Sequence, residues 1–197
     1  MCVTDQGTVY VTDSVGGGVY RLQGDLQTAK LEKIADGLFS PQTPVLSRDG
    51  KRLFVADYTM GIAVIDLPAA GAALNRSAKL NYLPYPENVA VVGLDGLYPS
   101  GDSLIGIQNG TQPERILRFL MNPAQTEITS DQVIHQIEQF DPTHAVEVDG
   151  WFYATANVGW SKVDDNTGQL KPGEKFTPPV LLKFRQEAPF HSKQPAR

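Results

Sequence analysis

Seven polar side chains stand at positions that could hold a metal ion or a small polar ligand. Three open predicted strands and four end predicted strands along the 197-residue chain: Gln42, Asp95 and Thr143, the last followed by His144, and then Asp13, Asp57, Asn109 and Asn157. Carboxylate and amide oxygens are the ligands that hard divalent cations such as calcium prefer. The imidazole of His144 could accept a proton or contact a substrate. These residue types predict a metal or ligand site, provided that the fold brings the positions together.

The four strand-ending residues belong to an internal repeat. Each follows a turn that carries Asp and Gly and then an apolar strand, and eight positions separate the first turn residue from the polar residue in all four segments, which span 5–13, 49–57, 101–109 and 149–157. The polar residues lie 44, 52 and 48 positions apart, in the range for four-stranded propeller blades. We therefore predict an all-β chain, a β-propeller of about four blades.

The next apolar strand of each blade follows the polar residue, at 19–22, 62–67, 116–120 and 180–184. Their length and their Val, Ile, Tyr and Phe content favour strands over helices, and 14 prolines and 18 glycines break the chain into short pieces. The last strand is delayed by an insertion from Val158 to Pro179 that contains Trp160, and we expect this insertion to overhang a binding site. We predict one domain over residues 1–185 and a polar tail over 186–197.

Propeller geometry predicts where the polar residues meet. The innermost strand of a blade starts at one face of the disc, and the second strand returns to that face. The beginnings of the first strands and the ends of the second strands therefore share one mouth, where we expect Gln42, Asp95 and His144 to face Asn109 and Asn157.

Each of these residues also has a structural interpretation. An Asp or Asn after a strand commonly accepts hydrogen bonds from nearby backbone N–H groups, which suits Asp13, Asp57, Asn109 and Asn157. His144 could equally be packed beside the channel. Asp95 opens a strand, where a carboxylate has little local backbone role, and it is therefore the leading functional candidate.

The composition is that of a globular domain, with 41% hydrophobic and 20% charged residues. The 17 Lys and Arg residues against 22 Asp and Glu give a net charge of −5 and form no basic run, so nucleic acid and anionic membrane are not expected partners. The chain has no long apolar stretch and no signal-peptide pattern. We expect a soluble chain of unknown compartment, and its opening residues, which read as the end of a strand, suggest a truncated N-terminus.

The segment from Ser40-Pro41-Gln42 through Asp49-Gly50 to Ala56-Asp57 resembles a blade of the gluconolactonase, regucalcin and strictosidine synthase-like propellers. Leu94-Asp95-Gly96-Leu97-Tyr98 is similar to the entry of the next blade in that superfamily. The similarity extends over nearly all of residues 1–185. Such propellers have six blades, so the resemblance implies that this chain corresponds to the C-terminal part of one, with open ends that could associate edge to edge. A short four-bladed propeller is the alternative.

The resemblance also implies a function, hydrolysis of a lactone or similar ester with the help of a bound divalent cation. Asp95 matches the family's aspartate metal ligand and catalytic carboxylate, and Gln42 falls where the family has an asparagine ligand. The family's glutamate ligand has no counterpart in this sequence. Asn109, His144, Asn157 and Trp160 would contact a small polar substrate. The alternative hypothesis is a non-catalytic propeller that binds a small molecule or a protein at the same mouth.

Overall fold

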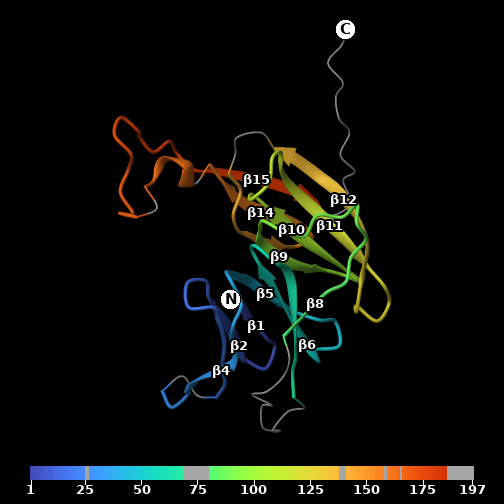
Figure 1. Ribbon diagram of the computed structural model, residues 1–197. Helices are drawn as coiled ribbons and strands as arrows, with labels where there is room; N and C mark the ends of the chain where they lie inside the picture. The colour runs from blue at the N-terminus through green and yellow to red at the C-terminus, as the bar shows by residue number, and fades with distance from the viewer. Residues whose placement is uncertain (25–26, 69–79, 138–140, 158, 165, 186–197) are drawn as a thin grey trace.

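The computed structural model describes residues 1–24, 27–68, 80–137, 141–157, 159–164 and 166–185. Within them, four antiparallel sheets follow one another along the chain as the blades of a β-propeller (Figure 1). The prediction of an all-β fold with four blades is confirmed, and the only helical turn in the described part of the chain is a short 3₁₀ segment at Trp160–Lys162. The predicted tail over 186–197 lies outside the described residues.

Three blades have four strands and the fourth has three. The first blade contains β1 (Cys2–Val3), β2 (Val9–Asp13), β3 (Gly18–Leu22) and β4 (Leu31–Ala35), and the second contains β5 (Pro41–Leu46), β6 (Arg52–Asp57), β7 (Gly61–Asp66) and β8 (Asn81–Tyr82). The third contains β9 (Leu94–Ser100), β10 (Ser103–Gln108), β11 (Glu114–Met121) and β12 (Ile128–Ile137), and the fourth contains β13 (Ala145–Val148), β14 (Trp151–Ala156) and β15 (Val180–Arg185).

The second strands end within one residue of the predicted positions. β2 and β6 end at Asp13 and Asp57 as predicted, whereas β10 and β14 end one residue before Asn109 and Asn157. The backbone N–H of Asn109 turns to the carbonyl of Gly93 at 3.1 Å, and Asn157 adopts a left-handed conformation with a φ of 56°. Both asparagines therefore leave the strand ladder.

Neighbouring blades pack face to face through three apolar clusters. Ile34 and Leu53 belong to the cluster between the first and second blades, Phe54 and Phe119 to that between the second and third, and Ile107 and Phe152 to that between the third and fourth. Buried aromatic rings of this size contribute strongly, since truncating one to alanine typically costs about 3–5 kcal/mol. The clusters hold the blades in a fixed relative orientation and so position the loops between them.

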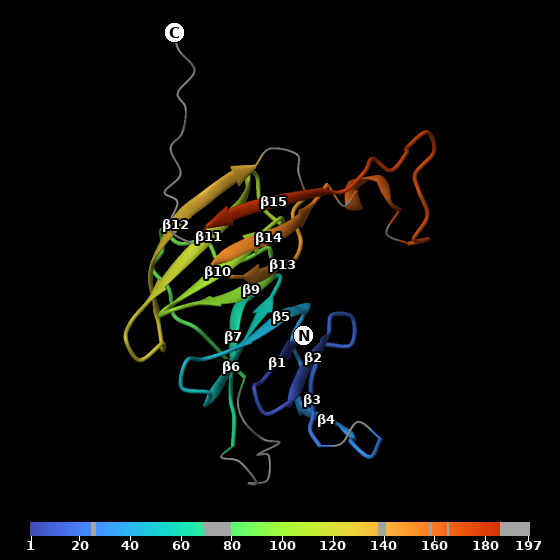
Figure 2. The ribbon, with the colours of Figure 1, turned by 180° about the vertical axis from the view of Figure 1, so that it is seen from behind.

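The first and fourth blades lie at opposite ends of this row, as both views of the ribbon show (Figures 1 and 2). The apolar clusters that the described residues form join consecutive blades only. The outward side of the fourth blade exposes Val146, Val148 and Leu181 by 57%, 48% and 68%. Among the described residues, no helix is long and apolar enough to cross a membrane.

Candidate functional site

A half-open pocket of about 1190 Å³ lies where the strand ends of all four blades converge. Its walls are drawn from residues before and after the strands and from the insertion between β14 and β15: Ser14, Val15, Ser40, Gln42, Tyr58, Asp95, Asn109, Asp141, Thr143, His144, Trp160, Val163 and Phe176. The volume lies slightly above the range of about 300–1,000 Å³ that is typical of small-molecule sites. The pocket therefore gathers Gln42, Asp95, Asn109, His144 and Trp160, five of the six predicted site residues.

Asp95 is the second residue of β9 and is half-buried in the pocket wall. The Asn109 side-chain amide donates to Asp95 Oδ2 at 3.0 Å, and the Tyr58 hydroxyl donates to Asn109 Oδ1 at 3.0 Å. Because the amide oxygen of Asn109 accepts the hydrogen bond from Tyr58, the amide nitrogen of Asn109 is directed at Asp95. The second and third blades thus fix one carboxylate through two consecutive hydrogen bonds.

The close approach of Tyr58 to Asn109 depends on two glycines. A Cβ on Gly110 would lie 2.7 Å from the Tyr58 hydroxyl oxygen, and one on Gly93 would lie 2.7 Å from the Gly110 Cα. Gly93 also has a φ of +70°, which side chains rarely tolerate. Tyr58 after β6, Gly93 before β9 and Gly110 after β10 therefore come this close only because both glycine positions lack side chains.

Burial is the main cause of the shifted pKa of Asp95. Removal from water raises the pKa of this carboxyl, because the charged form loses solvation. His144 and the hydrogen bond from Asn109 act in the opposite direction and lower the pKa, while Asp141 raises it further. A carboxyl that is oriented, partly desolvated and close to an imidazole has the properties of a general acid or base.

Gln42 and His144 both line the pocket but are held differently. The Gln42 amide nitrogen donates to the Ser40 hydroxyl at 3.0 Å. His144 is exposed, and its backbone carbonyl accepts a 2.8 Å hydrogen bond from the Thr155 N–H, which fixes the start of the fourth blade. The imidazole is therefore available to a ligand in the pocket.

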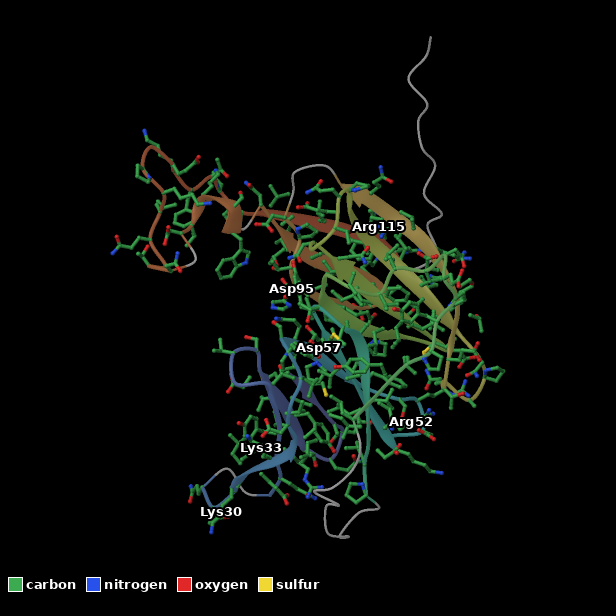
Figure 3. All side chains as sticks on the ribbon, in the orientation of Figure 1. Lys30, Lys33, Arg52, Asp57, Asp95 and Arg115 are labelled. Carbon is green, nitrogen blue, oxygen red and sulfur yellow. The ribbon has the colours of Figure 1, made fainter. Side chains whose placement is uncertain are left out.

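Asp13 and Asp57 occupy the same repeat position and both have structural roles. Asp57 is fully buried and accepts hydrogen bonds from the backbone N–H groups of Phe39 and Ser40, at 3.1 and 3.0 Å, and from the Tyr82 hydroxyl at 2.8 Å. Asp13 is exposed and accepts from the N–H groups of Val15 and Gly16. The carboxylates therefore stabilise loops at the mouth. Figure 3 shows Asp57 near Asp95 at the junction of the second and third sheets.

Asn157 is the predicted substrate contact that lies outside the pocket wall. Its amide nitrogen donates to the Thr177 hydroxyl at 2.7 Å and to the Pro178 carbonyl at 2.9 Å. Both partners belong to the end of the insertion, which extends beyond β14 and β15 (Figures 1 and 2). Asn157 thus anchors this arm, which we define as residues 159–164 and 166–179.

The arm brings Trp160 to the pocket. The Trp160 backbone N–H donates to Asp141 Oδ2 at 2.9 Å, and the Asp141 N–H donates to Glu114 Oε2 at 2.7 Å. The Trp160 side chain is 63% exposed and Phe176 is 59% exposed, although both line the pocket. Two aromatic residues of the arm therefore line the same pocket as Asp95 and Asn109.

The donors available for the predicted divalent cation are few. Asp95 and Gln42, which both line the pocket, supply one carboxylate and one amide, whereas calcium takes six to eight oxygens. In the described part of the chain, no cluster of three or more His, Cys, Asp or Glu side chains could hold a metal ion. The residues fit a resident metal poorly, and the metal stays a prediction.

Sequence reasoning did not single out Tyr58, Asp141 or Phe176. The signal for Tyr58 was its place directly after Asp57, since Ser14, which directly follows Asp13, lines the pocket as well. Asp141 precedes a proline and adopts a φ of 44°, a conformation that no simple pattern predicts. Phe176 reaches the pocket only through the path of the arm.

No family model matches the sequence, and no curated protein matches it. Solved structures with a similar fold include a candidate 6-phosphogluconolactonase from Bacteroides uniformis ATCC 8492, with a TM-score of 0.50 and 15% identity over 95% of this chain and 55% of that one. A second, from Bacteroides fragilis NCTC 9343, has a TM-score of 0.48 and 16% identity over 70% of this chain and 38% of that one. The chain therefore spans only part of these proteins, and at 15% identity the likeness to the Bacteroides uniformis structure shows a similar fold alone.

Proposed function

We propose that the pocket binds a small lactone or similar ester and hydrolyses it, with Asp95 as the catalytic carboxylate. The observation that carries the proposal is the fixed orientation of Asp95 by Asn109 and Tyr58 inside a pocket of ligand size. The similarity in fold to candidate 6-phosphogluconolactonases agrees with this choice of reaction class. Because propeller folds host many activities, the proposal depends on the residues of the site and not on the fold.

The proposed reaction is an addition of water followed by ring opening. Asp95 accepts a proton from a water molecule as the water oxygen forms a bond to the lactone carbonyl carbon. The bond from that carbon to the ring oxygen then breaks, and the departing oxygen takes the proton back from Asp95. His144, which lines the same pocket, contacts the substrate and could shuttle this proton.

Substitution of Asp95 tests the proposal. Asp95→Asn is nearly isosteric but cannot accept the proton, so we expect the rate of lactone hydrolysis to fall by about 10²–10⁴-fold, with the folded structure intact. The measurement is hydrolysis of glucono-δ-lactone by the wild-type and variant proteins, with circular dichroism as the folding control. Asp13→Asn makes the same change of side chain at an exposed turn, so it is the matched control and should keep full activity. Unchanged hydrolysis in the Asp95 variant would remove this residue from the mechanism.

The second candidate function is binding without catalysis, at the same pocket. The observation that favours it is the small number of metal donors around Asp95. Turnover separates the two: hydrolysis that is lost in Asp95→Asn while the lactone still binds favours the proposed hydrolase, and a divalent ion found by elemental analysis would add the predicted metal to it. Ligand binding without turnover, in both proteins, favours the binding function.

A further inference from the structure

A second cavity lies on the first blade, separate from the pocket at the mouth. Its volume is about 770 Å³, and its walls are formed by Arg21, Gln23 and residues 30–36. Among the described residues, the two cavities share no lining residue. Figure 3 shows Lys30 and Lys33 at the outer margin of the first blade, apart from Asp95. The cavity is therefore a feature of the blade's outer side.

This cavity runs along the edge of β4 and not over one of its faces. Side chains of a strand alternate between the two faces of a sheet, so a cavity over one face would be lined by every second residue. Here all residues from 30 to 36 contribute, including the exposed Lys33 and the buried Ile34. β4 is the outermost strand in the order β1-β2-β3-β4. The cavity therefore adjoins the outer edge of this sheet.

The outer edge of β4 offers backbone groups for pairing. Within the described part of the chain, β4 pairs with β3 alone. Residue pairs in an antiparallel ladder alternate between hydrogen-bonded and non-hydrogen-bonded, so every second residue of β4 directs its N–H and C=O away from β3. β4 has the sequence LEKIA, without proline, and each of its residues keeps its N–H donor. Such an edge is a template for a further strand.

The charged side chains along this edge leave one cation in excess. Arg21 pairs with Glu32 at 2.8 Å, and Lys33 pairs with Asp36 at 3.0 Å. Lys30 forms no ion pair or hydrogen bond with another described residue. The pair of Lys33 with Asp36 is exposed, with 45% and 60% of the two side chains accessible, and exposed pairs of this kind are weak. Both lysines can therefore pair with carboxylates of a ligand.

The same lysines decide which strand fits the edge. Lysine on an edge strand opposes pairing with basic or uncharged strands, and a second copy of β4 would bring its own Lys30 and Lys33 to these lysines. An acidic strand has the complementary charge. Leu31 is 57% exposed and lies two positions from Lys33, on the same face of β4. The edge therefore suits an apolar side chain close to an acidic one.

We propose that the edge of β4 binds an extended acidic segment of a partner protein, which adds to the first blade as a fifth strand. Backbone hydrogen bonds hold the segment, Lys30 and Lys33 pair with its carboxylates, and Leu31 contacts an apolar side chain. The site goes beyond the proposed hydrolysis, because it lies apart from the pocket of Asp95 and takes no part in that reaction.

Binding of a model peptide tests the proposal. The probe is a blocked peptide of about eight residues that alternates valine and glutamate, titrated calorimetrically into the 197-residue chain. We expect it to bind, and a peptide with lysine in place of glutamate to bind at least about tenfold more weakly. Methylation of its backbone nitrogens removes the N–H donors and should also weaken binding at least about tenfold. Absence of binding, or equal binding of any two of these peptides, would overturn the proposal.

A pair of charge reversals provides the control on the protein. Lys30→Glu should weaken binding of the glutamate peptide several-fold, because it places a carboxylate next to the peptide's own. Lys51→Glu makes the same change in the exposed turn between β5 and β6, outside the lining of the cavity, and should leave binding unchanged. Equal effects of the two variants would attribute binding to net charge and overturn the site.

Hydrogen exchange locates the bound peptide. Amides of Leu31–Ala35 should exchange more slowly in the complex, because their outward N–H groups become paired. β15 also carries cations, but Lys183 and Arg185 lie over the Trp151 ring, 4.3 and 4.4 Å from its centroid. Slower exchange confined to β15 would overturn the assignment to β4. Loss of peptide binding at high protein concentration would show that a second copy occupies the edge, and this too would overturn the proposal.

Discussion

At the scale of single residues, identical repeat positions have acquired different tasks. Asp13 and Asp57 end equivalent strands, yet one is exposed and the other has no solvent contact. Asn109 and Asn157 are equivalent as well, and one orients Asp95 while the other holds the arm. The side chain that each residue meets, and not the residue type, decides its role.

The contrast between the two aspartates leads to a stability prediction. Asp57→Asn replaces one acceptor oxygen by an amide group beside two backbone donors and the Tyr82 hydroxyl, so we expect unfolding free energy to fall by about 2–3 kcal/mol. Asp13→Asn retains an acceptor at an exposed turn and should cost less than about 1 kcal/mol. Urea denaturation of both variants checks this, and similar losses in the two would contradict the assigned burial.

At the scale of elements, the contact between the third and fourth blades contains a titratable ring. His135 in β12 lies edge-on to Phe184 in β15, with ring centroids 5.5 Å apart. Burial lowers the pKa of His135, because the charged imidazolium loses solvation in this contact. The neutral form therefore fits the blade interface better than the charged form.

This shift predicts a pH dependence of stability. The unfolded chain protonates His135 at a higher pH than the folded chain does. The stabilising contribution of the neutral ring is therefore complete above about pH 6.5, and it is lost as the pH falls through the lowered pKa of His135 in the folded chain. We expect the melting temperature of the wild-type protein to fall between pH 8 and pH 5 by more than that of His135→Gln. Identical pH profiles for the two proteins would show that the contact carries no proton linkage.

At the scale of the whole molecule, the four blades form a row, and within the described residues the apolar clusters join consecutive blades only. β15 is the last strand of a three-stranded sheet, whereas the other blades have a fourth strand. Val146, Val148 and Leu181 add exposed apolar surface on the same blade. Unpaired strand edges with apolar neighbours tend to recruit other chains.

We therefore propose that the 197-residue chain associates edge to edge through its terminal blades. Light scattering should show dimers or larger species, and Leu181→Lys should reduce them because a lysine on an edge strand opposes pairing. Val15→Lys adds the same charge in an exposed loop at the mouth and serves as the control. A stable monomer at high protein concentration would contradict the proposal.

The repeat in the sequence was sufficient to predict four blades, the ends of their second strands and the strand that follows each. The constant spacing from the Asp and Gly turns to the polar residues located each second strand within one residue, because strand length and turn type are local properties of the chain. The same order implied that Gln42, Asp95 and His144 would reach one mouth, where the structure places all three. Strand connectivity alone fixes which ends share a face.

Only the tertiary structure decided which polar residues serve the site. Asp57 is enclosed by a backbone turn at Phe39 and Ser40 and by Tyr82, three partners that no local pattern links to it. Tyr58 meets Asn109 across 51 positions of sequence because Gly93 and Gly110 allow the loops of two blades to approach. Burial and hydrogen-bond partners are set by such long-range contacts, so residues with the same local sequence become a buried support in one blade and a ligand-facing group in another.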